Sequence, residues 1–309
     1  MDYELVNYCE FDKHASKSYS LLYGVSEDKN LGDINNVDET KIEDFDLMTY
    51  GFPCQSFSVA GKRLGFEDPE KGNLFFESMR IVRHKKPTYL IAENVKGLVG
   101  HDKGNTFKTI LNTLEFLGYN NYYQVLNSVN FDIPQSRERI FIVSIRKDVD
   151  KKLFKFPVGN FTNKVVADFI DKDNENRYLK ESLKRFINNK YHRKYSSKNG
   201  IKKVFDGNVQ GYFESDFGGK RLYSIEGVCP TLTTKKEMAC FIEIESELNS
   251  KERLRLQGFN DEDYFKLKGK ISEAQLKKQT GNSITVNVVQ AIQENLLIAQ
   301  NELIYKVAQ

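Results

Sequence analysis

The stretch 89-YLIAENV-95 decides how the first half of the chain is interpreted. Its aromatic and apolar start predicts a buried strand over residues 89–92, and a carboxyl and an amide follow directly. Residues 73–86 carry apolar side chains at helical spacing and end before Pro87, which disfavours helical backbone ahead of it. A helix that leads into a buried strand is the repeating unit of a doubly wound α/β sheet.

The same alternation continues on both sides of this stretch. The apolar patterns predict strands over residues 4–8, 46–50, 122–126 and 140–145, and helices over residues 13–22 and 106–117. Gly118 follows the second of these helices in the C′ position, where glycine is favoured. We therefore predict an α/β fold that binds its ligands at the carboxyl ends of the strands.

After residue 156 the alternation breaks down. The following residues, up to about 280, are basic and rich in glycine and lysine, with only short irregular strands such as residues 239–243. From Ser283 an amphipathic helix is expected to run towards the C-terminus. We predict one domain formed by residues 1–165 together with 281–309, and a second, smaller domain formed by residues 166–280.

Composition favours a soluble globular protein, because 39% of the 309 residues are hydrophobic and 29% are charged. No run of about 18 apolar residues indicates a membrane span, and the first residues lack the basic and apolar regions of a signal peptide. We expect a cytoplasmic protein. The four cysteines form no C-x-x-C pair and have no histidine at zinc-finger spacing, so neither a metal site nor disulfides are expected.

The net charge of +3 conceals a strongly basic segment. Residues 177–203 contain ten lysines and arginines and a single acid, with four aromatic residues interleaved. Such a segment is either a solvated helical face or a surface that binds a polyanion. The sequence leaves both interpretations open.

Polar residues cluster at three strand ends of the predicted sheet. Cys54 follows Pro53 after one buried strand, Glu93 follows the 89–92 strand, and residues 135–139 (QSRER) precede the last one. Taken singly, a free cysteine is usually a small buried residue, an acid after a strand is usually solvated, and arginines often pair with acids. In a doubly wound sheet these ends converge, so a thiol, a carboxyl and a guanidinium are expected to share a pocket.

Five stretches, spread over nearly the whole chain, resemble the motifs of one known family. They are GFPCQSFSVAGKRLGF (51–66), ENVKGL (93–98), QSRERIFIV (135–143), RLYSIEGVCPTLTT (221–234) and TGNSITVNVV (280–289). Together they are similar to DNA cytosine-5 methyltransferases of the bacterial restriction-modification type. The resemblance implies an S-adenosylmethionine-dependent, Rossmann-like methyltransferase sheet, with residues 166–280 as a target-recognition domain.

The activity that this resemblance implies is transfer of a methyl group to C5 of a flipped-out cytosine in a specific double-stranded DNA sequence. Cys54 would be the nucleophile that adds to C6, Glu93 would supply a proton at N3, and Arg139 would hydrogen-bond O2. Arg137 and Gln135, from the same motif, would hold the loop or contact neighbouring groups. Double-stranded DNA is the implied partner, together with a cognate restriction endonuclease, and no metal is implied.

The implied methyl donor is S-adenosylmethionine, with S-adenosylhomocysteine as the product. Glu10 lies where an acid binds ribose hydroxyls, Phe11 can stack on adenine, and the GDIN segment can meet the adenine edge through Asp33 and Ile34. The remaining family positions around the cofactor are Pro53, Leu74, Asn282 and Ser283.

DNA contacts are implied in two regions. Ser56 and the loop with Lys62 and Arg63 resemble a mobile segment that closes over the flipped base, with a solvated surface loop as the alternative. In the second domain Arg221 can bind guanine through O6 and N7. The other candidates for base or phosphate contacts are Lys220, Thr231, Lys235 and Lys236.

The chain departs from the family pattern near its start. The family carries a glycine-rich motif, Phe-x-Gly-x-Gly, about 20 residues ahead of the ribose-binding acid, whereas Glu10 is already the tenth residue. Truncation or an internal start, a separate chain or missing segment that supplies the motif, and a degenerate relative are the three explanations. We expect the first, because the other motifs are intact. A tRNA cytosine-5 methyltransferase and a non-catalytic DNA-binding relative are the alternative functions.

Overall fold

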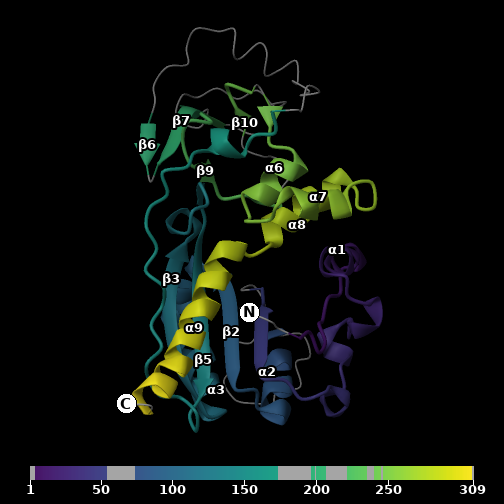
Figure 1. Ribbon diagram of the computed structural model, residues 1–309, viewed down its shortest axis with the longest axis vertical. Coiled ribbons are helices and arrows are strands. Elements are labelled where there is room, and N and C mark those ends of the chain that lie inside the picture. The colour runs from purple at the N-terminus through teal and green to yellow at the C-terminus, as the bar shows by residue number, and fades with distance from the viewer. Residues whose placement is uncertain are drawn as a thin grey trace. The chain divides into compact units, whose positions relative to one another are not determined.

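The computed structural model describes residues 4–53, 74–172, 196–198, 200–206, 221–234, 240–244 and 246–307 (Figure 1). The chain divides into two compact units. Unit 1 comprises Met1–Leu126, Glu138–Pro157 and Ala291–Gln309, and unit 2 comprises Asn127–Arg137 and Val158–Gln290. Among the described residues, no helix combines the length and the apolarity that a membrane crossing requires.

Unit 1 is built on a four-stranded sheet in the order β1-β2-β5-β3. Its strands are β1 (Leu47–Gly51), β2 (Tyr89–Val95), β3 (Tyr119–Asn127) and β5 (Glu138–Arg146). β1 runs parallel to β2, whereas β5 runs antiparallel to it. The predicted α/β fold is therefore confirmed, with a mixed sheet.

The described helices outside the sheet follow one another along the chain in the order that the sequence predicts. They are α1 (Lys13–Tyr23), α2 (Leu74–Lys85), α3 (Asn105–Phe116) and the long C-terminal α9 (Val286–Val307), whose first residues belong to unit 2. Short 3-10 helices connect them: η1 (Glu27–Lys29), η2 (Ile34–Asn36), η3 (Glu39–Lys41) and η5 (Lys96–Gly104). Asp12 caps α1 by accepting hydrogen bonds from two backbone amides, and Gly118 ends α3 with a φ of +95°.

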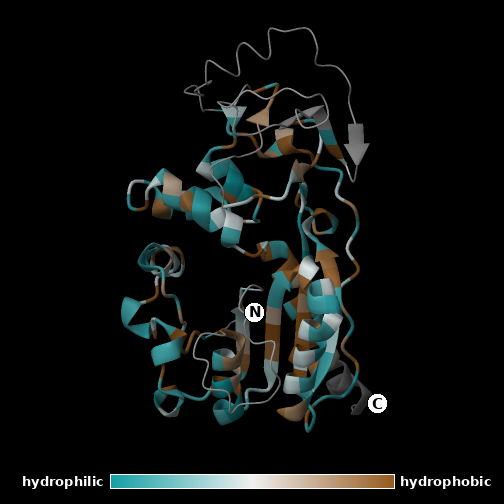
Figure 2. Cartoon of the chain, turned by 180° about the vertical axis from the view of Figure 1, so that it is seen from behind, coloured by the Kyte–Doolittle hydropathy of each residue, from teal (hydrophilic) through white to brown (hydrophobic). Residues whose placement is uncertain are grey.

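The core of unit 1 lies on the face of the sheet that α2 and α3 cover. Leu90 and Ala92 of β2 and Ile142 of β5 are buried there against Met79 of α2 and Ile110 of α3. Figure 2 shows hydrophobic residues concentrated on these strands. Because side chains alternate along a strand, Ile91 and Glu93 of β2 point to the opposite face.

One predicted strand of unit 1 is wrong. Residues 4–8 form no strand; they are extended and make a single isolated bridge, between Tyr8 and Asn30. The apolar pattern was present, but no second strand of the described chain runs alongside to complete a ladder. A strand end is also later than predicted, because β2 continues through Glu93 to Val95.

In its described residues, unit 2 combines short strands with three short helices. Its strands are β4 (Gln135–Ser136), β6 (Ser196–Lys198), β7 (Ile201–Asp206), β8 (Arg221–Tyr223), β9 (Cys229–Pro230), β10 (Cys240–Phe241) and β11 (Ser246–Glu247). The order β11-β10-β8-β7-β6 makes one sheet, and β4 pairs with β9. The helices are α6 (Ser250–Arg255), α7 (Asp261–Leu267) and α8 (Glu273–Asn282), with η6 (Ser128–Asn130) and η7 (Val166–Phe169).

Candidate active site

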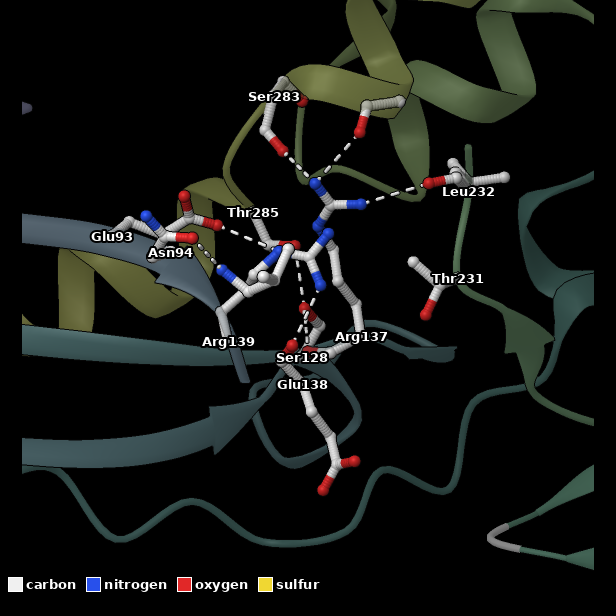
Figure 3. Close-up of polar contacts among 12 residues, drawn as sticks. Glu93, Asn94, Ser128, Arg137, Glu138, Arg139, Thr231, Leu232, Ser283 and Thr285 are labelled. Carbon is white, nitrogen blue, oxygen red and sulfur yellow. Dashed lines mark hydrogen bonds and ion pairs between the residues drawn. The ribbon is translucent and has the colours of Figure 1, made fainter. Parts of the chain in front are cut away.

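Two of the predicted catalytic side chains meet at one edge of the unit 1 sheet. Arg139 Nε lies 3.0 Å from Glu93 Oε1, and the two side chains are only 16% and 15% exposed (Figure 3). The antiparallel register pairs Val95 with Arg139, so the first residues of β5 lie beside the last residues of β2. Arg139 therefore stands inside a strand, not ahead of it as the sequence predicts, and still reaches the carboxyl.

The Arg139 guanidinium keeps its charge and part of its donor capacity. Burial lowers the pKa of Arg139, and the nearby Glu93 carboxylate raises it. Its Nη1 donates to the backbone oxygen of Glu138 at 2.8 Å. Within the described residues these two contacts engage two of the five N–H donors of a guanidinium. The remaining donors can bind a substrate carbonyl.

The backbone that leads into Cys54 is held beside this pair. Asn94 Nδ2 donates to the carbonyl oxygen of Phe52 at 2.7 Å, from the face of β2 opposite to Glu93. Gly51 pairs with Glu93 in the β1–β2 register, and a Cβ placed at Gly51 would lie 3.8 Å from Glu93 Oε2. Cys54 itself, with Ser56, Lys62 and Arg63, lies outside the described residues. The described backbone before Cys54 thus ends at Pro53, two residues after Gly51, which pairs with Glu93.

Four of the predicted cofactor residues of unit 1 lie in two neighbouring segments. Glu10 Oε1 accepts a hydrogen bond from the Asp12 backbone amide at 2.7 Å, and the ring of Phe11 is 81% exposed. Asp33 caps η2, and Ile34 begins that helix, packed against the small cluster around Ile81. A carboxylate and an exposed aromatic ring in one turn fit a nucleoside, which offers a diol and a flat base.

Two further predicted cofactor positions bracket the gap that contains Cys54. Pro53 follows β1 and is exposed, and Leu74 begins α2 and is partly buried against the core. The last two predicted cofactor positions, Asn282 and Ser283, belong to unit 2, where they form the end and the C-cap of α8. Among the described residues, no three His, Cys, Asp or Glu side chains gather as metal ligands.

Sequence reasoning missed Arg80 of α2. Its guanidinium donates to the backbone oxygens of Ile34 at 3.0 Å and Val37 at 2.9 Å, and it pairs with Glu77 and Glu39. Arg80 thereby ties the segment that follows Asp33 to α2. No local signal reveals this role, because the acceptors are main-chain groups more than 40 residues away.

In unit 2, Arg137 and Gln135 are buried and bind the protein itself. Arg137, 2% exposed, donates from Nη1 to Leu232 O at 3.1 Å and from Nη2 to Gly281 O and Ser283 O at 3.1 and 2.7 Å (Figure 3). Gln135 donates to Leu256 O at 2.8 Å and accepts from Leu232 N at 3.0 Å. These contacts favour positioning roles for both residues over contact with a reacting base.

Side-chain and main-chain hydrogen bonds to other parts of unit 2 hold the segment that follows β9. Besides the bonds to Leu232, the Thr231 hydroxyl donates to Ser136 O at 2.6 Å. Arg253 of α6, which sequence reasoning also missed, donates to Thr233 O, Thr280 Oγ1 and Lys277 O, each at 2.9 Å. Lys235 and Lys236, predicted to contact bases or phosphates, follow directly and lie outside the described residues, as does Lys220.

The structure describes the remaining predicted DNA-binding residues only in part. Arg221 is the first residue of β8. The basic segment 177–203 is described only in β6 and in the first residues of β7, with Gly200 between them, so both of its interpretations stay predictions. Thr231, the remaining candidate, is half-buried.

The fold is shared with solved methyltransferases. The chain is similar to Dnmt2 methyltransferase of S. pombe, with a TM-score of 0.62 and 18% identity over 96% of this chain and 90% of that one. It is also similar to a DNMT2 of Spodoptera frugiperda, with a TM-score of 0.65 and 17% identity over 96% and 93% of the two chains. This likeness shows that the chain has the fold of these methyltransferases.

The family is narrower than the fold. Residues 1–297 match the family model of the C-5 cytosine-specific DNA methylases, and the chain belongs to this family. It is 35% identical to type II methyltransferase M.HhaI of Haemophilus parahaemolyticus over 93% of this chain and 85% of that protein. It is 38% identical to type II methyltransferase M.Bsp6I of Bacillus sp. (strain RFL6) over 93% and 89%. The chain is accordingly a DNA methyltransferase that acts at C5 of cytosine.

Proposed function

We propose that the protein transfers a methyl group from S-adenosylmethionine to C5 of a flipped-out cytosine in a specific double-stranded DNA sequence, through a covalent bond between Cys54 Sγ and C6. The observation that carries this proposal is the Glu93–Arg139 pair, at 3.0 Å, on the edge from which the backbone proceeds through Pro53 to Cys54. The pair offers an acid and a cation at the strand ends from which the chain continues to Cys54.

The roles follow from the charge that develops on the ring. When the Cys54 thiolate adds to C6, electron density moves towards N3 and O2 and makes C5 nucleophilic. Glu93 takes up a proton from solvent when the cytosine displaces it from Arg139 and delivers that proton to N3, and Arg139 donates hydrogen bonds to O2. S-adenosylmethionine, when bound, supplies an electrophilic methyl group. C5 then loses its proton to water, Cys54 leaves with the electron pair of the C6–S bond, and N3 returns its proton to Glu93, which restores the neutral aromatic ring.

The ion pair also explains how the site is prepared before the base arrives. In the described structure each partner neutralises the other in a largely buried position, so neither is an isolated buried charge. Entry of the cytosine edge replaces their mutual contact by one contact each to N3 and O2. Side chains that are already held at the edge lose little freedom in that exchange.

The other assignments are part of the same proposal. Residues 1–165 with 281–309 carry catalysis and cofactor binding, and residues 166–280 recognise the target. The cofactor contacts the eight residues predicted above, from Glu10 to Ser283. The flipped base and its flanking DNA contact Ser56, Lys62, Arg63, Lys220, Arg221, Thr231, Lys235 and Lys236. The type II names of two relatives favour a cognate restriction endonuclease as a cellular partner.

Transfer of labelled methyl to a library of duplex DNA, with tRNA in parallel, tests the substrate class. We expect label in DNA at a defined sequence and none in tRNA; label only in tRNA would replace DNA as the substrate.

Duplex DNA with 5-fluorocytosine at the target tests the mechanism, because fluorine cannot leave as the proton does. The covalent adduct should form with the wild type and not with Cys54→Ser, and an adduct with that variant would exclude Cys54 as the nucleophile.

A further inference from the structure

Asn30 lies between the two segments that carry the proposed cofactor residues of unit 1, and its side-chain amide makes four hydrogen bonds. Oδ1 accepts from the backbone amides of Glu10 at 2.9 Å and Gly32 at 3.0 Å. Nδ2 donates to Glu10 O at 3.0 Å and to Ser16 Oγ at 2.9 Å. A primary amide has two N–H donors and two acceptor lone pairs, so these bonds use its full capacity.

The backbone around Asn30 explains why a side chain is needed there. Tyr8 exchanges two main-chain bonds with the opposite segment, from its own amide to Lys29 O at 3.0 Å and from the Leu31 amide to Tyr8 O at 2.7 Å. Gly32, with a φ of +73°, then turns that segment away. At Glu10 the amide of Asn30 takes over, since it binds both the N–H and the C=O as an adjacent strand would.

The positions of the proposed cofactor residues depend on the Asn30 side chain, which binds the backbone in place of an adjacent strand. Residues 4–8 form no strand in the described structure, so no continuous ladder fixes Glu10. A single oxygen, Asn30 Oδ1, receives one N–H from the Glu10 segment and one from the segment of Gly32 and Asp33. That oxygen therefore sets the distance between the two halves of the proposed nucleoside site.

We propose that Asn30 is a positioning residue for S-adenosylmethionine, which it does not touch, and that its amide sets cofactor affinity by holding Glu10 in register with Asp33. The inference rests on the proposed function, in that Glu10 and Asp33 are taken as the ribose and adenine contacts. A carboxylate displaced by about 1 Å no longer meets both hydroxyls of a ribose diol, so binding weakens while the groups that act on cytosine are unaffected.

The test is calorimetry of S-adenosylhomocysteine binding to the full chain and to Asn30→Ala and Asn30→Asp. Alanine removes all four bonds, and we expect affinity to fall at least tenfold. Aspartate keeps both acceptor functions and loses both donors, to Glu10 O and to Ser16 Oγ, so its affinity should lie between those of the wild type and the alanine variant. In steady state, the KM for S-adenosylmethionine should rise in the same order, with kcat at saturating cofactor and the KM for DNA nearly constant.

Asn121→Ala is the matched control. Asn121 is also a half-buried amide of unit 1 with side-chain bonds, to Leu111 O at 3.3 Å and from Ser144 Oγ at 2.7 Å, and no proposed cofactor residue is among its partners. This variant should lower the melting temperature without changing cofactor affinity. A role of Asn30 in folding alone would give the same pattern for Asn30→Ala, and that result would overturn the inference.

Equal affinity of the wild type and Asn30→Ala would also overturn it, and would leave the proposed function intact. Unchanged S-adenosylhomocysteine affinity in both Glu10→Ala and Asp33→Ala would instead remove the assignment of these two residues, and the inference with it. The adduct assay, run at saturating S-adenosylmethionine, reports on the catalytic proposal alone, so its failure is distinguishable from failure of the positioning role.

Discussion

Glu93 and Arg139 are paired across strands that run in opposite directions, with Glu93 near the end of β2 and Arg139 near the start of β5. Their ladder partners are offset by two residues, Phe141 for Glu93 and Val95 for Arg139. Residues two positions apart on neighbouring strands share a face, so the long arginine side chain lies diagonally over the carboxyl. This diagonal fixes a carboxyl and a guanidinium on one edge without any loop.

Glu93→Gln should lower the rate of methyl transfer about 100-fold or more, because glutamine keeps the shape but cannot deliver a proton to N3. Single-turnover kinetics with preformed enzyme–DNA complex measure the effect. The control is Glu138→Gln, a neighbouring glutamate that is paired with Lys96 at the surface, and its rate should match the wild type. A rate for Glu93→Gln within tenfold of the wild type would contradict the acid role.

Arg137→Lys should lower the free energy of unfolding by about 2–4 kcal/mol, because one ammonium cannot replace the guanidinium bonds to three separate carbonyl oxygens in a buried position. Urea unfolding measures the change. Arg146→Lys, at the surface beside Asp148, is the control and should cost about 1 kcal/mol or less. Equal losses in the two variants would show that the buried contacts add nothing.

Gly281→Ala should destabilise the protein even though alanine is the better helix former. A Cβ at this position in α8 would lie 2.5 Å from the carbonyl carbon of Thr233 and 2.6 Å from Thr234 N, both backbone atoms. The peptide must shift, at a cost of about 1–3 kcal/mol that exceeds the helix gain of about 1 kcal/mol. Gly97→Ala, which meets nothing within 4 Å, should be neutral in the same thermal unfolding experiment. A stabilised Gly281→Ala would refute this close packing.

Asp261→Asn should cost stability at neutral pH and less in acid. Hydrogen bonds from Arg255, with a smaller effect of Lys251, lower the pKa of Asp261 to about 2. Because this folded-state pKa lies below the unfolded value of about 4, the contribution is complete above pH 4 and fades as the pH falls towards 2. We expect a loss of about 1 kcal/mol at pH 7, smaller at pH 3, by urea unfolding. The same loss at both pH values would argue against the ion pair as its cause.

The sequence predicts the elements of the sheet well and their ends less well. Helical spacing locates α2, and the apolar run locates β2, because burial on both faces requires such patterns. The apolar run of residues 89–92 did not reveal that β2 continues through Glu93. The additional residues of β2 are in the strand because they pair with the antiparallel β5, and the local sequence does not encode the direction of β5. The strand predicted over residues 4–8 is wrong for the converse reason, because an apolar segment forms a strand only where a second strand lies beside it.

In the candidate site too, the sequence reveals residues that belong to local motifs and misses residues whose partners are distant in the sequence. Motif spacing found Glu93 and Arg139, and strand alternation brings them to one face. Asn30, Arg80 and Arg253 escaped because each binds main-chain groups of segments that are distant in the sequence. A backbone oxygen has no sequence signature, so residues that serve it are visible only once the chain is folded.

The boundary between the two units passes through one short motif, after Arg137 and before Glu138. Gln135 and Arg137 therefore belong with residues 158–290, while Arg139 belongs with the sheet that bears Glu93. Anyone grafting a foreign recognition unit onto this scaffold, to redirect it to another DNA sequence, would have to transplant residues 127–137 as well. A chimera that replaced only residues 166–280 would leave the native Gln135 and Arg137 beside foreign residues at positions 232 and 256.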